Sequence, residues 1–298
     1  MDMPMLEPTT VAEAYAIVPM AFELSERCGS PVFVRSVTAI ANSHAPVDVG
    51  DPVPPEERES ILEWDITKYT KAGSAIAQAQ HRQVIERLAE AGEVARGLVG
   101  AMELNELRLA NEPGGVGVIA SGVVASYLPE ALGILTKHGL DLDRVSLLKV
   151  RVTNPLPATE MRALLTHCDA VVVLEELEPY VEERAIMEAR EVGFEGRIIG
   201  KINGPLERVG EYGVEDVVQA VAEGLDLSVP EGALEGVEGG EALAAARPIT
   251  VCAGCPHRGT YMAINQALRN LKFRKGEVMV TGDIGCTILG MNDPFKTV

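Results

Sequence analysis

The stretch VGVIASG, residues 116–122, decides the fold of this chain. It is a short apolar run that ends in a tight turn, and a segment of helical composition follows it. The same pattern then recurs along the chain. The predicted strands are 116–120, 145–150, 170–174 and 197–199, and the predicted helices are 125–138, 159–166, 180–192 and 216–224. Short apolar strands that alternate with helices predict an α/β fold with a doubly wound parallel sheet, which we place in residues 114–225.

The segments before this repeat are of a different kind. Residues 11–28 have the apolar spacing of an amphipathic helix, and residues 32–35 predict a short strand. Because one helix and one strand cannot close a core, we expect residues 1–50 to be the C-terminal end of a domain that begins upstream. Residues 51–113 open with DPVPP and continue as Ala-, Glu- and Leu-rich sequence, which predicts a linker with two helices, at 75–91 and 94–109.

The segments after the repeat are shorter. Residues 226–248 are rich in Gly, Glu and Ala without apolar periodicity, which predicts a linker. Residues 249–251 predict a strand that opens a further block. Because residues 249–298 are too few for an α/β domain, we expect them to be the start of a truncated one.

Composition excludes several classes of protein. Lys and Arg number 26 and Asp and Glu number 44, so the net charge is −18, which argues against a nucleic-acid partner. The apolar runs are too short to span a bilayer, and the acidic N-terminus lacks the features of a signal peptide. Five cysteines, an odd number, do not make a disulfide framework. We therefore expect a cytoplasmic location and no membrane partner.

Three cysteines lie close to the C-terminus. Cys252 and Cys255 form a C-x2-C pair, and Cys286 follows in a glycine-rich turn. Two thiolates at this spacing can bind one tetrahedral metal ion, zinc included, or one face of an iron–sulfur cluster. The pattern also suits a thioredoxin-like redox pair or isolated buried thiols. No fourth ligand is evident, since His257 is next to the pair in an awkward position.

The stretch VMVTGDIGCTILG, residues 278–290, predicts a strand that runs into glycines and then a helix start. Backbone N–H groups left free in such a turn can hold phosphate oxygens. An ordinary α/β turn is the alternative, and by itself the motif is weak.

Other polar groups follow the predicted strands, where doubly wound sheets bind ligands. Thr153-Asn-Pro155 and Asn203-Gly-Pro205 are each more typical of simple turns. Glu175, Glu176 and Glu178 are candidates for paired-acid catalysis. The favoured interpretation is a solvated helix N-terminus that the carboxylates stabilise.

Together these motifs resemble a known family. Cys252-Ala-Gly-Cys-Pro-His-Arg258, followed by Thr281-Gly-Asp-Ile-Gly-Cys286, is similar to the α subunit of the indolepyruvate ferredoxin oxidoreductases, which are thiamine-diphosphate-dependent. Further matches, in the same order, are PMLEP (4–8), AFELSE (21–26), SPV (30–32) and LEELE (174–178). The likeness covers most of residues 4–50 and 114–298.

The resemblance implies the domain identities and the site residues. Residues 1–50 would end a thiamine-pyrimidine-binding domain, 114–225 would form a transketolase-C-like domain, and 249–298 would begin a thiamine-pyrophosphate-binding domain. Ile284, Gly285, Cys286 and Thr287 would contact thiamine diphosphate. Cys252, Cys255 and Cys286, with a later fourth cysteine, would hold a [4Fe–4S] cluster. The catalytic glutamate and the Mg²⁺ ligands would lie outside this chain.

The resemblance also implies a function for the whole enzyme. It would oxidatively decarboxylate an aryl 2-oxoacid such as indolepyruvate to an acyl-CoA, with a β subunit as partner and ferredoxin as electron acceptor, and this fragment alone would be inactive. Three alternatives stay open: another 2-oxoacid as substrate, a zinc-stapled structural or interaction module, and a non-catalytic binding subunit of the same superfamily.

Overall fold

The computed structural model describes residues 2–51, 64–98, 102–229, 232–234, 251–274 and 276–296. The chain divides into two compact units, Met1–Val237 and Glu238–Val298.

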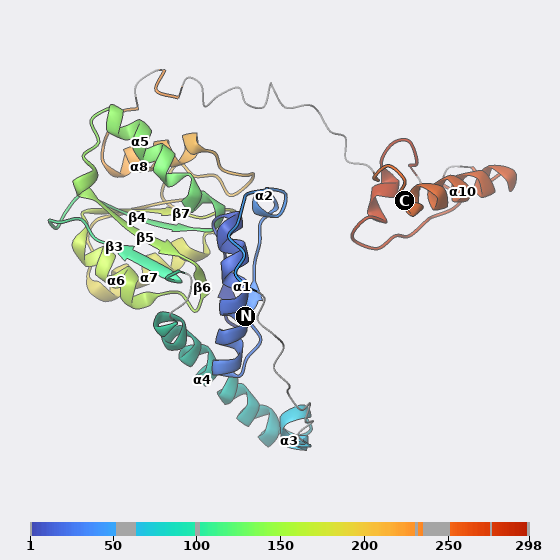
Figure 1. Cartoon of the computed structure of the whole chain (residues 1–298), viewed down its shortest axis with the longest axis horizontal. Helices are drawn as coiled ribbons and strands as arrows, with labels where there is room; N and C mark the ends of the chain where they lie inside the picture. Colours follow the sequence, from blue (N-terminus) through green and yellow to red (C-terminus); the bar gives the residue numbers. More distant parts are fainter. Residues whose placement is uncertain are drawn as a thin grey trace. The chain divides into compact units, whose positions relative to one another are not determined.

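A five-stranded sheet forms the centre of the first unit (Figure 1). In spatial order its strands are β3 (Asn105–Arg108), β5 (Val145–Val150), β4 (Val116–Ser121), β7 (Ala170–Leu174) and β8 (Arg197–Ile199). The last four strands are parallel to one another, whereas β3 pairs antiparallel with β5. The predicted doubly wound parallel sheet is therefore confirmed, with one antiparallel strand added at its edge.

Helices cover both faces of this sheet (Figure 1). They are α5 (Leu128–Lys137) and α8 (Val214–Gly224) on one face, and α6 (Ala158–His167) and α7 (Tyr180–Val192) on the other. Two short 3-10 turns, η1 (Gly122–Ser126) and η2 (Leu142–Arg144), lead into α5 and β5. The four helices predicted for this region are all present.

Strand β7 shows why the central strands are apolar throughout. Val172 and Leu174 pack into the cluster beneath α5 and α8, whereas Val171 and Val173 pack into the cluster beneath α6 and α7. Because successive side chains point to opposite faces and both faces are covered, every position is buried.

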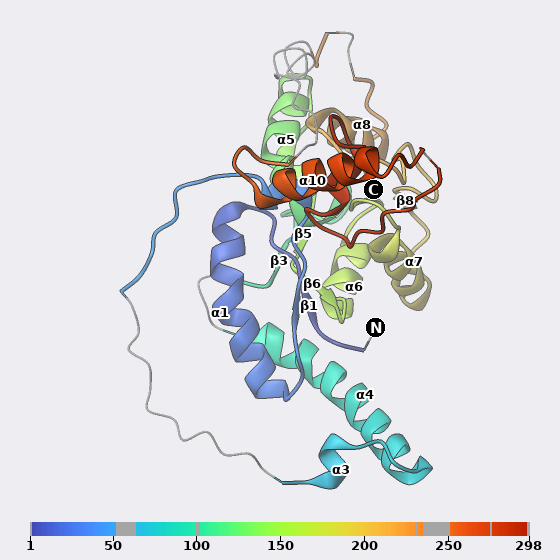
Figure 2. The same ribbon diagram turned by 90° about the vertical axis from the view of Figure 1, so that its right-hand side faces the viewer.

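The N-terminal segment packs against the edge of this α/β layer. It consists of β1 (Met5–Leu6), α1 (Val11–Cys28), β2 (Phe33–Val34) and α2 (Thr38–Ala41). Strand β1 pairs with β2 in parallel and with β6 (Val152–Asn154) antiparallel. One apolar cluster joins Leu6, Leu24, Ala91 and Val152, and α1 lies beside α4 (Ser74–Gly97) in Figure 2. Residues 1–50, which cannot close a core alone, thus complete one by packing against α4 and β6.

The prediction of two helices between residues 75 and 109 is wrong. Helix α4 continues through Gly92 to Gly97, a short α3 (Ile66–Tyr69) precedes it, and Asn105–Arg108 forms strand β3. Gly92 does not break the helix but permits close packing, because a Cβ there would lie 3.0 Å from Pro155 Cγ. Strand β3 forms because β5 supplies backbone hydrogen-bond partners along its whole length, which overrides local helix propensity.

The second unit holds a helix that the sequence analysis missed. Helix α10 (Pro256–Asn270) begins with a proline in its first turn, a position where proline is favoured, and η3 (Ile288–Met291) follows the glycine turn. A small cluster of Val251, Tyr261 and Phe295 joins them. The predicted strand at Val278 is absent, because the described residues of this unit contain no strand with which it could pair.

Two predictions fall mainly outside the described residues. These are the strand at 249–251, of which only Val251 is described, and the linker at 226–248. In the described part of the chain, no helix combines the length and the apolar character that crossing a bilayer requires.

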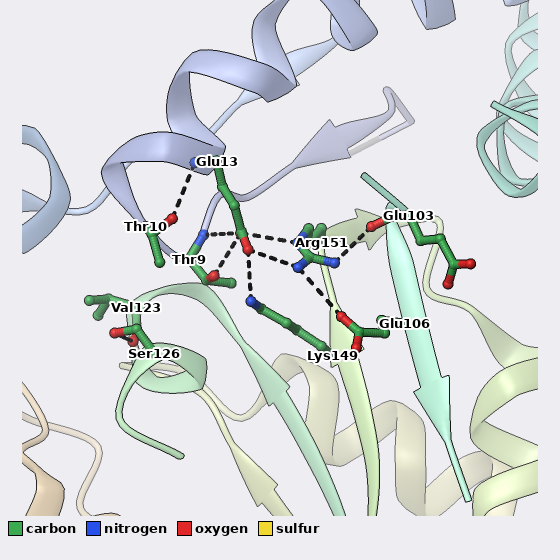
Figure 3. Close-up of polar contacts among 9 residues, drawn as sticks. All are labelled: Thr9, Thr10, Glu13, Glu103, Glu106, Val123, Ser126, Lys149 and Arg151. Atoms are coloured by element: carbon green, nitrogen blue, oxygen red, sulfur yellow. Dashed lines mark hydrogen bonds and ion pairs between the residues drawn. The ribbon is translucent and has the colours of Figure 1, made fainter. Parts of the chain in front are cut away.

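A buried ionic network holds the N-terminal segment on the sheet (Figure 3). Glu13 Oε1 of α1 lies 2.7 Å from Lys149 Nζ and 2.8 Å from Arg151 Nη2, and Glu13 Oε2 accepts a hydrogen bond from Arg151 Nε at 3.0 Å. The same Oε2 accepts hydrogen bonds from the backbone N–H and the hydroxyl of Thr9. Arg151 Nη1 donates to the carbonyl oxygen of Glu103 at 2.7 Å. The network therefore links α1 to β5 and to the segment before β3.

The Glu13 carboxylate is stabilised strongly in its charged form. Burial alone would raise the pKa of Glu13, but hydrogen bonds from Arg151, Lys149 and Thr9 outweigh it and lower the pKa to about 2. Since the folded-state pKa lies below the unfolded value near 4.5, the stabilisation is complete above about pH 4.5. It is lost as the pH falls toward 2.

We predict that Glu13→Gln lowers the free energy of unfolding at pH 7 by about 3 kcal/mol, because the variant removes the nearer carboxylate from the buried Arg151 guanidinium and leaves it only Glu106, at 3.8 Å. Urea denaturation at pH 7 and pH 3 measures this. The difference between the wild type and the variant should shrink at pH 3, because Glu13 is then mostly protonated in the unfolded wild type but still mostly ionised in the folded one.

Glu23→Gln is the matched control on the same helix. Glu23 pairs with Arg27 four residues later, and both side chains are about half exposed. We expect a change below about 0.5 kcal/mol, since exposed pairs of this kind contribute little. Equal effects of the two substitutions would contradict the importance of the buried network.

Candidate functional site

A cavity of about 430 Å³ lies in the first unit, where the sheet meets the N-terminal segment. Ser121 ends strand β4, Asn154 ends β6, and Glu175 follows β7, and all three line the cavity. Met5 and Glu7 from the N-terminal segment also line the cavity. The carboxyl ends of parallel strands are where doubly wound sheets bind ligands, so this cavity is the candidate site of the unit.

Glu175 is the most constrained acid in the cavity wall. Its Oε2 accepts a hydrogen bond from the Val181 N–H at 2.8 Å, and its Oε1 accepts one from the Glu182 N–H at 2.9 Å. The prediction that carboxylates after the third strand stabilise a helix N-terminus is confirmed for α7. The expectation of solvation is wrong for Glu175, which is only 4% exposed.

Burial has a large effect on the acids of this wall. It raises the pKa of Glu175 to about 7, although two backbone hydrogen bonds and the charge of Lys201 act in the opposite direction. Burial also raises the pKa of Glu7 and of Glu176. The Lys201 ammonium donates to the Glu175 carbonyl oxygen, and burial lowers its pKa. Near neutral pH, therefore, both the ionised and the protonated forms of Glu175 are populated.

A second buried carboxylate holds the loop that follows β8. Glu182 is 1% exposed and accepts hydrogen bonds from the N–H groups of Lys201, at 2.7 Å, and Ile202, at 3.1 Å. Gly200 is required there, because a Cβ would lie 2.4 Å from Glu182 Cδ. The Asn203-Gly-Pro205 segment in this loop is not among the residues that line the cavity, in agreement with its interpretation as a simple turn.

The Thr153-Asn-Pro155 segment, by contrast, does reach the cavity. Thr153 and Asn154 both line it, and Asn154 Nδ2 donates to the Met3 carbonyl oxygen at 2.7 Å. The Thr153 side chain is almost fully buried, and its hydroxyl oxygen has no hydrogen-bond partner in the described part of the chain. The interpretation of this segment as a turn alone missed that role.

The three cysteines predicted as metal ligands are in the second unit. Cys252 and Cys286 are exposed, and Cys255 is half-buried. Among the described residues, no group of three or more Cys, His, Asp or Glu side chains is arranged to hold a metal ion. In the described part of the chain, therefore, these three thiols are not gathered at one metal site.

His257 stands closer to the cysteine pair than its spacing suggested. Its Nδ1 lies 3.2 Å from Cys255 Sγ, at the start of helix α10. The helical turn brings the two side chains together across one intervening residue. Its position next to the pair, which looked awkward for a ligand in the sequence, therefore does not keep it away from Cys255.

The glycine turn has features that suit phosphate oxygens. Gly285 has φ of +112°, and space is open where its Cβ would be. Asp283 and Thr287 brace the turn, since the Thr287 hydroxyl donates to the Asp283 carbonyl oxygen at 2.6 Å and accepts from the Asp283 N–H. The N–H groups of Gly285 and Cys286 donate to no acceptor within the described ranges. The predicted cofactor residues therefore fit a pyrophosphate group.

We predict that the stability of the first unit falls as the pH rises from 5 to 8. Because the folded-state pKa of Glu175 lies above the unfolded value of 4.5, the folded state binds more protons in this range. The loss amounts to at most about 3 kcal/mol. Urea denaturation at the two pH values should show this slope, and Glu175→Gln should remove most of it.

Glu178→Gln provides the control for that measurement. Glu178 belongs to the same loop, but its side chain is 72% exposed and pairs with Arg208. This variant should keep the wild-type slope between pH 5 and 8. An unchanged slope in Glu175→Gln would refute the assignment of the titration to Glu175.

Comparison with curated proteins shows similarity along nearly the whole chain. The chain is 30% identical over 302 residues to the indolepyruvate oxidoreductase subunit IorA of Methanothermobacter thermautotrophicus, which covers 99% of this chain and 45% of that protein. It is 31% identical over 300 residues to IorA of Pyrococcus abyssi, covering 100% of this chain and 44% of that protein. The chain thus spans about half the length of the curated relatives that it matches. No protein-family model matches it.

Two solved structures align with part of the chain. A 2-oxoglutarate:ferredoxin oxidoreductase from Magnetococcus marinus aligns with a TM-score of 0.48 and 18% identity, over 74% of this chain and 42% of that one. A split-gene transketolase aligns with a TM-score of 0.42 and 17% identity, over 76% of this chain and 58% of that one. The resemblance predicted from the sequence motifs is confirmed by the curated relatives: over 99% of its length, this chain is similar to IorA, a subunit of indolepyruvate oxidoreductase.

Proposed function

We propose that this chain forms part of the α subunit of a thiamine-diphosphate-dependent indolepyruvate:ferredoxin oxidoreductase. The observation that carries the proposal is the 30% identity to an IorA subunit over 99% of the chain. The whole enzyme would convert an aryl 2-oxoacid and CoA to an acyl-CoA and carbon dioxide. The two electrons released in this oxidation would pass to ferredoxin.

The proposal includes the partners of the whole enzyme. A β subunit would complete the complex, and 2-oxoacid, CoA and ferredoxin would be its substrates. The five cysteines, all unpaired, favour a reducing compartment, and we assign the enzyme to the cytoplasm.

The glycine turn is the part of this chain that we assign to the cofactor. Thiamine diphosphate, when bound, supplies the electron sink that decarboxylation of a 2-oxoacid requires. The N–H groups of Gly285 and Cys286 would donate to its pyrophosphate oxygens, and Ile284 and Thr287 would flank it. Tyr261 supports the turn from helix α10, since its hydroxyl donates to the Thr287 carbonyl oxygen. These residues would bind and orient the cofactor.

We also propose that Cys252, Cys255 and Cys286 bind a [4Fe–4S] cluster in the complete enzyme. The C-x2-C spacing and the similarity to IorA support this assignment. In the described structure the three thiols stand apart, so binding would require the cysteine pair and the glycine turn to approach each other. Metal analysis separates this proposal from a zinc-stapled module, because only a cluster contains iron and acid-labile sulfide.

We predict that the complete enzyme containing this chain reduces viologen or ferredoxin when supplied with indolepyruvate and CoA. Its kcat/KM should be at least tenfold higher for indolepyruvate than for 2-oxoglutarate, a difference of about 1.4 kcal/mol in transition-state binding. A preference for 2-oxoglutarate would reassign the substrate. Absence of reduction with any 2-oxoacid, despite bound cofactor, would refute the enzymatic function.

A pair of neighbouring substitutions separates the two proposed roles of the glycine turn. Gly285→Val should weaken thiamine diphosphate binding at least tenfold, because a β-branched residue does not tolerate φ of +112°. Cys286→Ser keeps the backbone N–H, so it should bind the cofactor normally but lose iron if the thiolate is a ligand. Calorimetric titration with thiamine diphosphate and iron analysis of the complete enzyme measure both effects.

Gly276→Val controls for backbone strain, since Gly276 also has positive φ, of +95°, in the same unit. It should leave cofactor affinity unchanged. Unchanged affinity in Gly285→Val would contradict the pyrophosphate assignment. Normal iron content and normal ferredoxin reduction in Cys286→Ser would contradict the cluster assignment.

A further inference from the structure

The proposed reaction assigns no role to the cavity at the carboxyl edge of the sheet. Its volume of about 430 Å³ lies in the range of small-molecule sites. Met3, Met5 and Val181 give it an apolar lining, and Tyr180 adds an aromatic ring. An apolar body of the size of one or two rings would therefore fit within it.

The charge of the wall is predominantly negative. Four carboxylates line the cavity, those of Glu7, Glu175, Glu176 and Glu178, and among the described lining residues Arg35 is the one cation. Both oxygens of Glu175 are engaged by helix α7, and Glu178 pairs with Arg208 outside the lining. Glu7 and Glu176 therefore carry most of the charge that remains for a ligand.

Glu7 is the least satisfied of these acids. It is 4% exposed, and its nearest ionic partner, Arg35 Nη1, lies 3.6 Å away, which is longer than a hydrogen bond. In the described part of the chain its carboxylate accepts no hydrogen bond. A buried carboxylate without a hydrogen-bond donor lowers the stability of the fold. A ligand that supplied a donor would remove this loss of stability.

Thr153 is a second, independent indication of a missing partner. It lines the same cavity from β6, it is 3% exposed, and its hydroxyl oxygen has no hydrogen-bond partner among the described residues. Native structures contain few such groups, and each calls for a physical reason. An ammonium group has three donors and suits a carboxylate and a hydroxyl oxygen together.

We propose that this cavity is a binding site for a small ligand in which an ammonium group is attached to an apolar body. Glu7 would receive the ammonium group with help from Glu176, and Thr153 would accept a further hydrogen bond. The methionines and Tyr180 would contact the apolar part. The proposal does not depend on the redox function, because all of these residues lie in the first unit and the proposed cofactor residues lie in the second.

Calorimetric titration of the chain with three probes tests the proposal. One probe has the full set of proposed features, and each of the other two differs from it in a single feature. The probes are 2-phenylethylamine, 3-phenylpropionate, which has the same ring and linker but a negative charge, and ethylamine, which has the charge but no ring. 2-Phenylethylamine should bind saturably with a Kd below about 1 mM. The other two should bind at least tenfold more weakly. Equal binding of the anion, or no saturable binding of the amine, would overturn the proposal.

Variants then locate the site. Glu7→Gln should weaken 2-phenylethylamine binding at least tenfold, and Glu176→Gln, at a half-exposed position, should weaken it several-fold. Glu191→Gln, an exposed position on α7 away from the cavity lining, is the control of equal charge change and should have no effect. The location would be refuted if Glu7→Gln and Glu176→Gln each bound the amine as tightly as the wild type. If Glu7→Gln does not fold, Thr153→Val takes its place, and unaltered binding in Thr153→Val and Glu176→Gln would refute the location.

Thr153→Val distinguishes a ligand contact from a packing defect. It keeps the shape of the side chain and removes the unpaired hydroxyl, so the melting temperature of the free protein should stay the same or rise. At the same time the affinity for 2-phenylethylamine should fall several-fold. A variant that melts at or above the wild-type temperature and binds the amine as tightly would show that the hydroxyl has no role in the site.

Discussion

The ion pairs between Glu13 and the two cations of strand β5 and its end, Lys149 and Arg151, are the interaction on which the first unit depends. Glu13 is on α1, more than 130 residues away along the chain from its partners. This contact ties α1 to the sheet, and the apolar packing of α1 against α4 supports it. The hydrogen bonds to Thr9 add a second constraint, because they fix the turn into the helix at the same carboxylate.

The position of β1 follows from this anchor. Since Thr9 and Glu13 are held, the preceding residues run along β6, and Met5 pairs with Asn154. Glu7 is thereby brought to the carboxyl ends of the central strands. A Cβ on Gly122 would lie 2.7 Å from Glu7 Oε1, so a glycine at the end of β4 is needed for this approach. Residues of the N-terminal segment and residues of the α/β sheet thus line the cavity together.

The two candidate sites of the chain make different physical demands. The cavity in the first unit is built from regular elements, whose packing leaves buried carboxylates with raised pKa values. The glycine turn in the second unit lies between a helix and a 3-10 turn, and it presents backbone N–H groups rather than side chains. Because the cofactor binding that we propose for this turn depends on backbone conformation, we expect Gly285 to matter more there than any charged residue.

The sequence by itself determined the central α/β layer, the helix at residues 11–28 and the resemblance to IorA, because these rest on local patterns. Apolar runs of strand length alternate with helical segments, and the cysteine and glycine motifs are contiguous. Tertiary structure decided what depends on partners distant along the chain. Residues 105–108 became a strand only because β5 was available, and the strand expected at Val278 did not form where no partner strand is described. The cavity was likewise beyond prediction, since Glu7, Thr153 and Glu175 meet only after β1, β6 and β7 have packed, and their burial, not their identity, sets their chemistry.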